Sequence, residues 1–185
     1  MSLLGVRVLG DPILRAETKV VAAVTPEIRQ LVADMFETMY AAKGIGLAAP
    51  QVGRSERLAV VDVEHTPMVI INPEVLRQDG KGKAEEGCLS IPDIYGDVER
   101  ATQVTVRAMD LDGNTRDVDA TDLRARCLLH EIDHLHGKLF IDYLSVLKRR
   151  GALSKWAKEK DKYPGFVRVL TPEDVAAHHH RDEEL

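Results

Sequence analysis

Apolar residues recur at helical spacing after Thr25-Pro26, which predicts an amphipathic helix early in the chain. Threonine accepts hydrogen bonds from the free N–H groups of a first helical turn, and proline suits the first helical position. The helix is therefore expected to begin at this pair. Its buried face is expected to contain the apolar residues Ile28, Leu31, Val32, Met35, Phe36 and Met39.

Short apolar runs rich in β-branched residues follow and predict β-strands. Residues 58–63 and 68–73 are two such runs, and residues 103–109 alternate apolar and polar positions as a half-buried strand does. A turn at residues 112–114 then predicts a hairpin whose second strand covers residues 115–118. Between the strands, two stretches rich in glycine, residues 44–51 and 79–83, are expected to be a tight loop and a mobile connection.

A second long run without glycine or proline extends from Thr121 to Gly137 and predicts a central helix. Thr121 and Asp122 can accept hydrogen bonds at its start, and Gly137 can end it. A third, highly charged helix is expected over residues 145–162. These elements predict an α+β fold, in which small antiparallel sheets pack around the central helix and further helices lie towards the N- and C-terminal ends.

The length of 185 residues favours one domain with a substantial core. We expect a single domain over residues 1–164 and a C-terminal tail of uncertain order over residues 165–185. Three consecutive histidines, residues 178–180, lie in this tail and are interpreted as solvated rather than as a metal site.

Composition narrows the classes of function. The net charge of -5 and the pI near 5.8 provide no basic surface for nucleic acid. No apolar run approaches membrane-spanning length, and residues 1–10 lack the apolar core of a secretion signal, so a cytoplasmic protein is expected. Cys88 and Cys127 are too few for a disulfide scaffold.

The central helix carries a metal-binding pattern. Residues 130–134 read H-E-x-x-H, and residues four apart on a helix face the same way. His130 and His134 can therefore bind one metal ion, while Glu131 lies along the edge of the site towards a metal-bound water.

The third ligand decides the class of site, because catalytic zinc-type centres usually have three protein ligands and one open position. A metzincin protease requires histidine where Phe140 stands, and the glutamate of a thermolysin-like site would have to be Glu159, on a charged face. Cys127 lies one turn before the first histidine on the same helix face. Cys88 is the better candidate, because a glycine beside it leaves room and a proline soon after indicates an irregular turn. Two imidazoles and a thiolate suit iron or zinc.

Three blocks together resemble the peptide deformylase family: GIGLAAPQ at residues 44–51, EGCLS at residues 86–90 and HEIDH at residues 130–134. The likeness extends from about Leu4 to Leu147. One departure is Leu129, which stands where the family usually has glutamine. Activity is expected to survive this change, with altered hydrogen bonding around the ligands.

The resemblance implies a hydrolase that removes the N-formyl group from the initiator methionine of newly made proteins and releases formate. Metal-bound water would attack the formyl carbon, and ferrous iron is the expected metal, with zinc, nickel or cobalt as alternatives. Expected partners are N-formylmethionyl nascent peptides and the ribosome near the nascent-chain exit. The implied roles are metal ligand for Cys88, His130 and His134, general base and acid for Glu131, and donor to the substrate oxygen for Gln51 and the Leu89 N–H.

The methionine side chain is expected to enter an apolar pocket formed by Ile45, Leu123 and Cys127. The substrate backbone is expected to pass Ile45, Gly46 and Gly87 as an added strand. The same apolar residues would also suit an ordinary core.

Other interpretations stay open at this point. Asp133 could orient a ligand through Arg100 or Arg107, or form an ordinary surface ion pair. The two rival functions are a metallopeptidase, which Phe140 disfavours, and a non-catalytic domain that folds around a closed metal site. The closed site would need Cys127 as a ligand in addition to Cys88.

Overall fold

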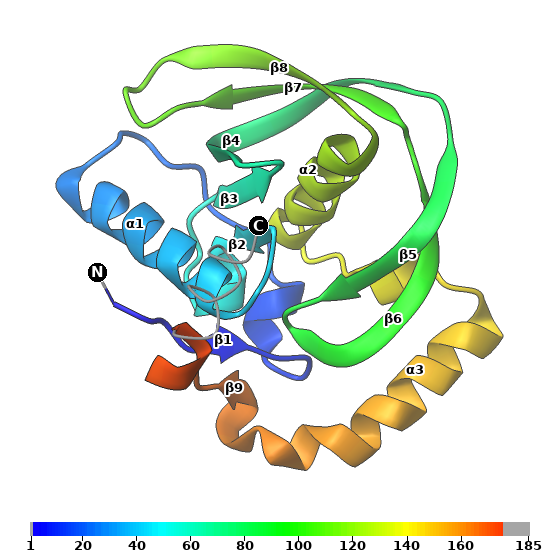
Figure 1. Cartoon of the computed structure of the whole chain (residues 1–185). Helices are drawn as coiled ribbons and strands as arrows, with labels where there is room; N and C mark the ends of the chain where they lie inside the picture. The colour runs from blue at the N-terminus through cyan, green and yellow to red at the C-terminus, as the bar shows by residue number, and fades with distance from the viewer. Residues whose placement is uncertain (1, 176–185) are drawn as a thin grey trace.

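A computed structural model describes residues 2–175 of the chain. Its largest sheet is antiparallel and has the strand order β2-β3-β4-β7-β8. The strands are β2 (Gly46–Ala48), β3 (Leu58–Val63), β4 (Thr66–Asp79), β7 (Gln103–Met109) and β8 (Thr115–Thr121). Figure 1 shows that this sheet curves around one side of helix α2 (Asp122–Leu135).

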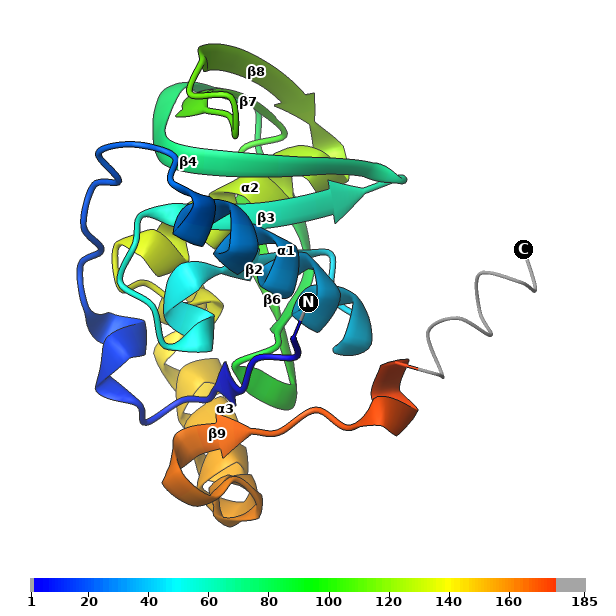
Figure 2. The ribbon, with the colours of Figure 1, turned by 90° about the vertical axis from the view of Figure 1, so that its left-hand side faces the viewer.

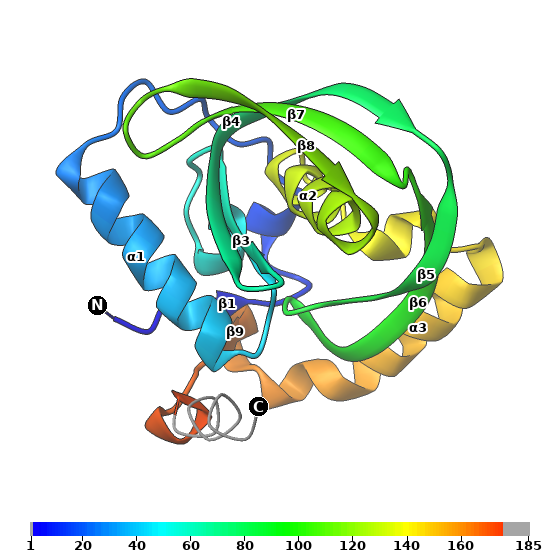
Figure 3. The same cartoon turned by 45° about the horizontal axis from the view of Figure 1, so that its top comes forward.

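A long hairpin of β5 (Gly82–Cys88) and β6 (Ile91–Arg100) lies on the other side of α2, so the helix is enclosed between two sheets (Figures 1 and 3). The apolar side of α2 packs into the main core, where Ala125, Leu128 and Leu135 are fully buried. The two histidines of the H-E-x-x-H pattern therefore emerge from a helix held on both sides.

Helix α1 (Pro26–Ala41) covers the opposite face of the main sheet. The side chains of β3 alternate as a two-sided strand requires: Val61 belongs to the core beneath α2, and Val60 belongs to the core beneath α1. The Thr25 hydroxyl accepts a hydrogen bond from the Ile28 N–H at 3.2 Å and caps α1 as predicted. Strand β2 is thereby held between the two helices, on the edge of the sheet.

The two ends of the described chain meet. Strand β1 (Val6–Arg7) pairs with β9 (Val167–Arg168), which follows helix α3 (Val146–Glu159), as Figure 2 shows. None of the helices in residues 2–175 combines the length and the apolar character needed to cross a bilayer. Short 3-10 helices complete the fold: η1 (Pro12–Arg15), η2 (Ala49–Val52), η3 (Phe140–Tyr143), η4 (Lys160–Lys162) and η5 (Pro164–Phe166).

The α+β class with a central helix is confirmed, as are the helix after Thr25, the strands at 58–63 and 103–109, and the hairpin that turns at residues 112–114. The irregular chain predicted around Cys88 and Pro92 is present, but it lies within a hairpin. Cys88 pairs with Ile91 across a tight turn of two residues, whereas Gly87 pairs with Tyr95, so residues 92–94 bulge out of the ladder. The β5 sequence GKAEEGC is glycine-rich and charged, so it lacks the apolar alternation that identifies a strand.

Two boundaries and one helix cap also differ from the prediction. Residues 44–51 contain β2 and the start of η2 rather than a loop, and the connection at 79–83 shrinks to a turn because β4 and β5 extend into it. The α2 helix ends at Leu135, and the side chain of Thr121 at its N-cap accepts no hydrogen bond from the helix. Gly137 ends α2 as predicted, because it follows the C-cap His136 directly and adopts a left-handed φ of 71°.

The residues expected to form a tail contain ordered structure up to residue 175. Strand β9 lies within them, and Leu170 is buried against Val6 and Ala42. The histidines at 178–180 lie outside the described residues, and the domain boundaries stay a prediction.

Candidate metal centre and active site

Three side chains, one from β5 and two from α2, lie close together between these elements. Cys88 comes from the end of β5, while His130 and His134 lie one turn apart on α2. Their potential ligand atoms all lie within 4.8 Å of one another. The His134 Nε2 atom is 3.3 Å from the Cys88 Sγ and 3.2 Å from the His130 Nε2.

These separations fit a shared metal ion. Two nitrogens bound at about 2.05 Å to one tetrahedral ion lie about 3.3 Å apart. A thiolate and two imidazoles are also a donor set that iron and zinc accept. Burial and, to a smaller extent, electrostatic repulsion from the neighbouring His130 lower the pKa of His134 well below its usual value. His134 therefore stays in the neutral form that metal binding requires.

A buried carboxylate orients the first histidine. Glu86 Oε1 lies 2.9 Å from His130 Nδ1, and because a carboxylate only accepts, Nδ1 carries the hydrogen and Nε2 is the ring atom left to face a metal. Two arginines bind the same carboxylate: Arg100 with two hydrogen bonds of 2.6 and 2.9 Å, and Arg126 with one of 2.7 Å. Although burial raises the pKa of Glu86, the hydrogen bonds with His130 and Arg100 lower it to about 2, so the carboxylate stays ionised.

The network extends to Asp133, whose carboxylate accepts from Arg100 at 2.9 Å and from the Tyr143 hydroxyl at 2.8 Å. Arg107 instead pairs with Asp117 across the hairpin. Of the two arginines considered for Asp133, the structure therefore selects Arg100. The link to the ligand runs through Glu86, a residue that the sequence placed in a motif but gave no role.

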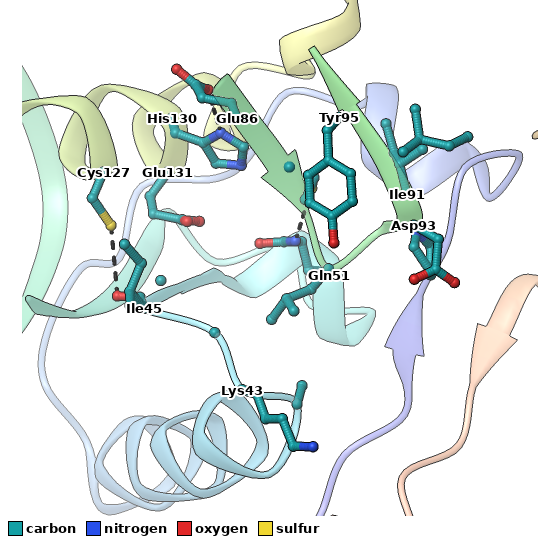
Figure 4. A pocket seen from close by; sticks show the side chains of 18 of the residues that line it. Lys43, Ile45, Gln51, Glu86, Ile91, Asp93, Tyr95, Cys127, His130 and Glu131 are labelled. Carbon is teal, nitrogen blue, oxygen red and sulfur yellow. Dashed lines mark hydrogen bonds and ion pairs between the residues drawn. The ribbon is translucent and has the colours of Figure 1, made fainter. Parts of the chain in front are cut away.

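Glu131 lies beside the three ligands and is 3% exposed. Burial raises the pKa of its carboxyl group to about 7, although the charges of His130 and Arg100 oppose the shift. A carboxyl group with such a pKa can both accept and release a proton near neutral pH. Figure 4 shows Glu131, His130 and Gln51 around one cavity.

Gln51 has a defined orientation. Its Oε1 accepts a hydrogen bond of 2.9 Å from the Ala48 N–H, so its Nε2 must face the other way. There it donates to the Ser90 Oγ at 3.1 Å and approaches the Cys88 Sγ at 3.6 Å. One amide N–H of Gln51 thus points at the metal centre. Ser90 as its partner was missed, although the serine is part of the EGCLS block.

A cavity of about 580 Å³ opens onto these groups. Every residue predicted for the site lines it except His134, which is 1% exposed. Leu123 and Ile45 are half exposed at its wall, with exposed fractions of 50% and 44%. The lining residues from the predicted site are Ile45, Gly46, Gln51, Gly87, Cys88, Leu89, Leu123, Cys127, His130 and Glu131.

Cys127 does not join the ligand group among the described residues. Its thiol lies 3.6 Å from the Ile45 carbonyl oxygen, a contact that Figure 4 shows. Burial, followed by the charges of Glu131 and Glu86, raises the pKa of this thiol well above its usual value. The side chain of Cys127 therefore lines the cavity as a protonated thiol.

Two further observations bear on the sequence analysis. The Phe140 ring, at the position that rejects a metzincin, stacks on the His130 ring with centroids 6.5 Å apart. Leu129 is 8% exposed and belongs to the apolar core, and the ligand His130 donates its hydrogen bond to Glu86 on β5. Arg168, on β9, also lines the cavity and was missed because it lies beyond the last recognisable motif.

Comparison with known proteins agrees with this geometry. A family model described as polypeptide deformylase matches residues 3–150. The peptide deformylase of Hydrogenovibrio crunogenus is 52% identical over 152 residues, which cover 80% of this chain and 90% of the relative. That of Alkalilimnicola ehrlichii is 49% identical over 162 residues, covering 85% and 91%.

Solved structures give the same result. The crystal structure of a peptide deformylase from Legionella pneumophila superposes with a TM-score of 0.83 at 45% identity, covering 86% of this chain and 96% of that one. The Ehrlichia chaffeensis enzyme in complex with actinonin also has a TM-score of 0.83, at 40% identity and with 86% and 98% coverage. The family match extends over most of the chain and includes all three motifs, and on this ground the protein belongs to the peptide deformylase family.

Proposed function

We propose that this enzyme removes the formyl group from N-formylmethionyl peptides with a divalent metal ion held by Cys88, His130 and His134. The convergence of these three ligand atoms beside the buried carboxyl group of Glu131 is the observation that carries the proposal. When bound, the ion supplies Lewis-acid chemistry, polarising the formyl oxygen and making water nucleophilic near neutral pH.

Glu131 performs the proton transfers. It accepts a proton from the attacking water and returns a proton to the amine nitrogen when the C–N bond of the formamide breaks. Its pKa of about 7 suits both steps, because the ionised and protonated forms are both populated near neutrality. The products are formate and a free amino terminus.

Gln51 and the backbone N–H of Leu89 stabilise the negative charge that develops on the formyl oxygen. The hydrogen bond from Ala48 fixes the amide of Gln51, so its N–H is oriented before substrate arrives. A neutral amide donates there without adding a negative charge beside the thiolate of Cys88.

The cavity receives the methionine side chain between Ile45, Leu123 and Cys127, and the peptide backbone runs past Gly46 and Gly87 towards the open side. Strand β2 is an edge of the main sheet, so its outer edge has room for an added strand. Ferrous iron is the proposed native metal, since the donor set suits it, and zinc, nickel and cobalt are the alternatives. The cytoplasmic location and the ribosome contact stay predictions.

The test is anaerobic formate release from formyl-Met-Ala-Ser, with metal analysis of the same sample. Glu131→Gln should keep the metal and lose about 10²–10⁴-fold in turnover, because it removes the proton acceptor without removing a ligand. Unchanged turnover in this variant would refute the role of Glu131. Cleavage of the internal peptide bonds would favour the metallopeptidase instead.

A further inference from the structure

The carboxylate of Glu131 lies against bare backbone at Gly46 of strand β2. A Cβ atom added to Gly46 would lie 2.3 Å from the Oε1, 2.8 Å from the Cδ and 2.9 Å from the Cγ of Glu131. All three distances are shorter than non-bonded atoms tolerate. The φ of Gly46 lies outside the left-handed region, so the strand conformation does not itself require glycine. A side chain at residue 46 is excluded because Glu131 occupies the space that it would fill.

Neither partner can move away freely. Gly46 pairs with Val61 in the antiparallel ladder, and both residues are buried. Glu131 sits on a helix whose apolar side is locked into the main core. Its Oε2 is buried and has no hydrogen-bond partner among the described residues. Contact with β2, more than hydrogen bonding, therefore determines where the carboxylate lies.

We propose that Gly46 is a positioning residue that seats the carboxylate of Glu131 at the reacting atoms. This inference rests on the proposed role of Glu131. Strand β2 then positions both Glu131 and Gln51, because Ala48, two residues after Gly46, orients the Gln51 amide. A methyl group at residue 46 displaces the carboxylate while leaving the metal ligands untouched.

The first experiment measures kinetics and metal content of Gly46→Ala. We expect full metal content and a kcat about 10²-fold lower, the scale of loss for a misplacement of about 1 Å. KM can rise as well, because the substrate backbone passes Gly46, and the proposal depends on the loss in kcat. Gly151→Ala is the matched control, because a Cβ on this residue of α3 meets no atom within 4 Å. A raised KM with unchanged kcat would mean that the methyl group only obstructs substrate, and would overturn the proposal.

The second experiment needs no activity. Gly46→Ala should lower the Tm by several degrees in the wild-type and Glu131→Gln backgrounds, because glutamine has the same shape as glutamate. In the Glu131→Ala background the shift should vanish, since the clashing group is gone. Equal shifts in all three backgrounds, or failure of the Gly46→Ala/Glu131→Ala protein to fold, would overturn the proposal. If the wild type released no formate but this coupling held, the contact would stand and the proposed function would fail.

Discussion

At the scale of single residues, the same cavity holds two cysteines with different surroundings. Cys88 lies with two imidazole nitrogens, and Cys127 lies against a carbonyl oxygen with its thiol kept protonated by burial. Cys88 lies within the EGCLS block and Cys127 lies three residues before His130, and helix geometry alone permitted Cys127 as a ligand. Because their surroundings differ, replacing each cysteine in turn should change the metal content of the protein differently.

We predict that Cys88→Ser purifies with little or no metal, because a serine hydroxyl stays protonated at neutral pH and is a poor ligand for iron or zinc. Cys127→Ser should retain its metal. Metal analysis of both proteins, purified anaerobically in parallel, checks this. Loss of metal only from Cys127→Ser would reverse the assignment.

At the scale of elements, the two helices that flank β2 begin in different ways. Thr25 caps α1 with a side-chain hydrogen bond, whereas the side chain of Thr121, at the corresponding position of α2, accepts none from its helix. Helix α2 depends instead on apolar packing against the main sheet and on polar contacts to the β5–β6 hairpin, such as that of Arg126 with Glu86.

Thr25→Ala should therefore destabilise the protein by about 0.5–2 kcal/mol, the usual cost of removing a cap. Thr121→Ala is the matched control and should cost less, because no cap bond is lost. Urea unfolding of the two variants measures the difference. A larger loss for Thr121→Ala would show that the described cap of α1 contributes little.

At the scale of the whole molecule, residues 165–175 close the fold. Strand β9 pairs with β1, Leu170 is buried beside Ala42, and Arg168 lines the same cavity as the ligands. Although the family match ends at residue 150, these contacts lead us to expect that the segment behaves as part of the domain.

Leu170→Ala should lower the free energy of unfolding by about 2–5 kcal/mol, as for other buried leucines. Val169→Ala should change it little, since Val169 is 77% exposed. Chemical denaturation reports both, with a shifted midpoint and an unchanged slope in the first variant. An unchanged free energy of unfolding in Leu170→Ala would support the expectation of a C-terminal tail of uncertain order.

The sequence by itself determined the parts that depend on local spacing. The i, i+4 histidines must share a helix face, the Thr25-Pro26 pair must open a helix, and β-branched runs must form strands, since each follows from backbone geometry over a few residues. The three motifs together were enough to identify the family.

Only the tertiary structure decided what depends on residues far apart in the chain. It brought Cys88 rather than Cys127 to the histidines, placed Glu86 and Arg100 behind His130, and set Gly46 against Glu131. It also made a strand of a glycine-rich, charged segment, because pairing along a hairpin outweighs weak local preference. These contacts arise from packing across the core, which has no signature in local sequence spacing.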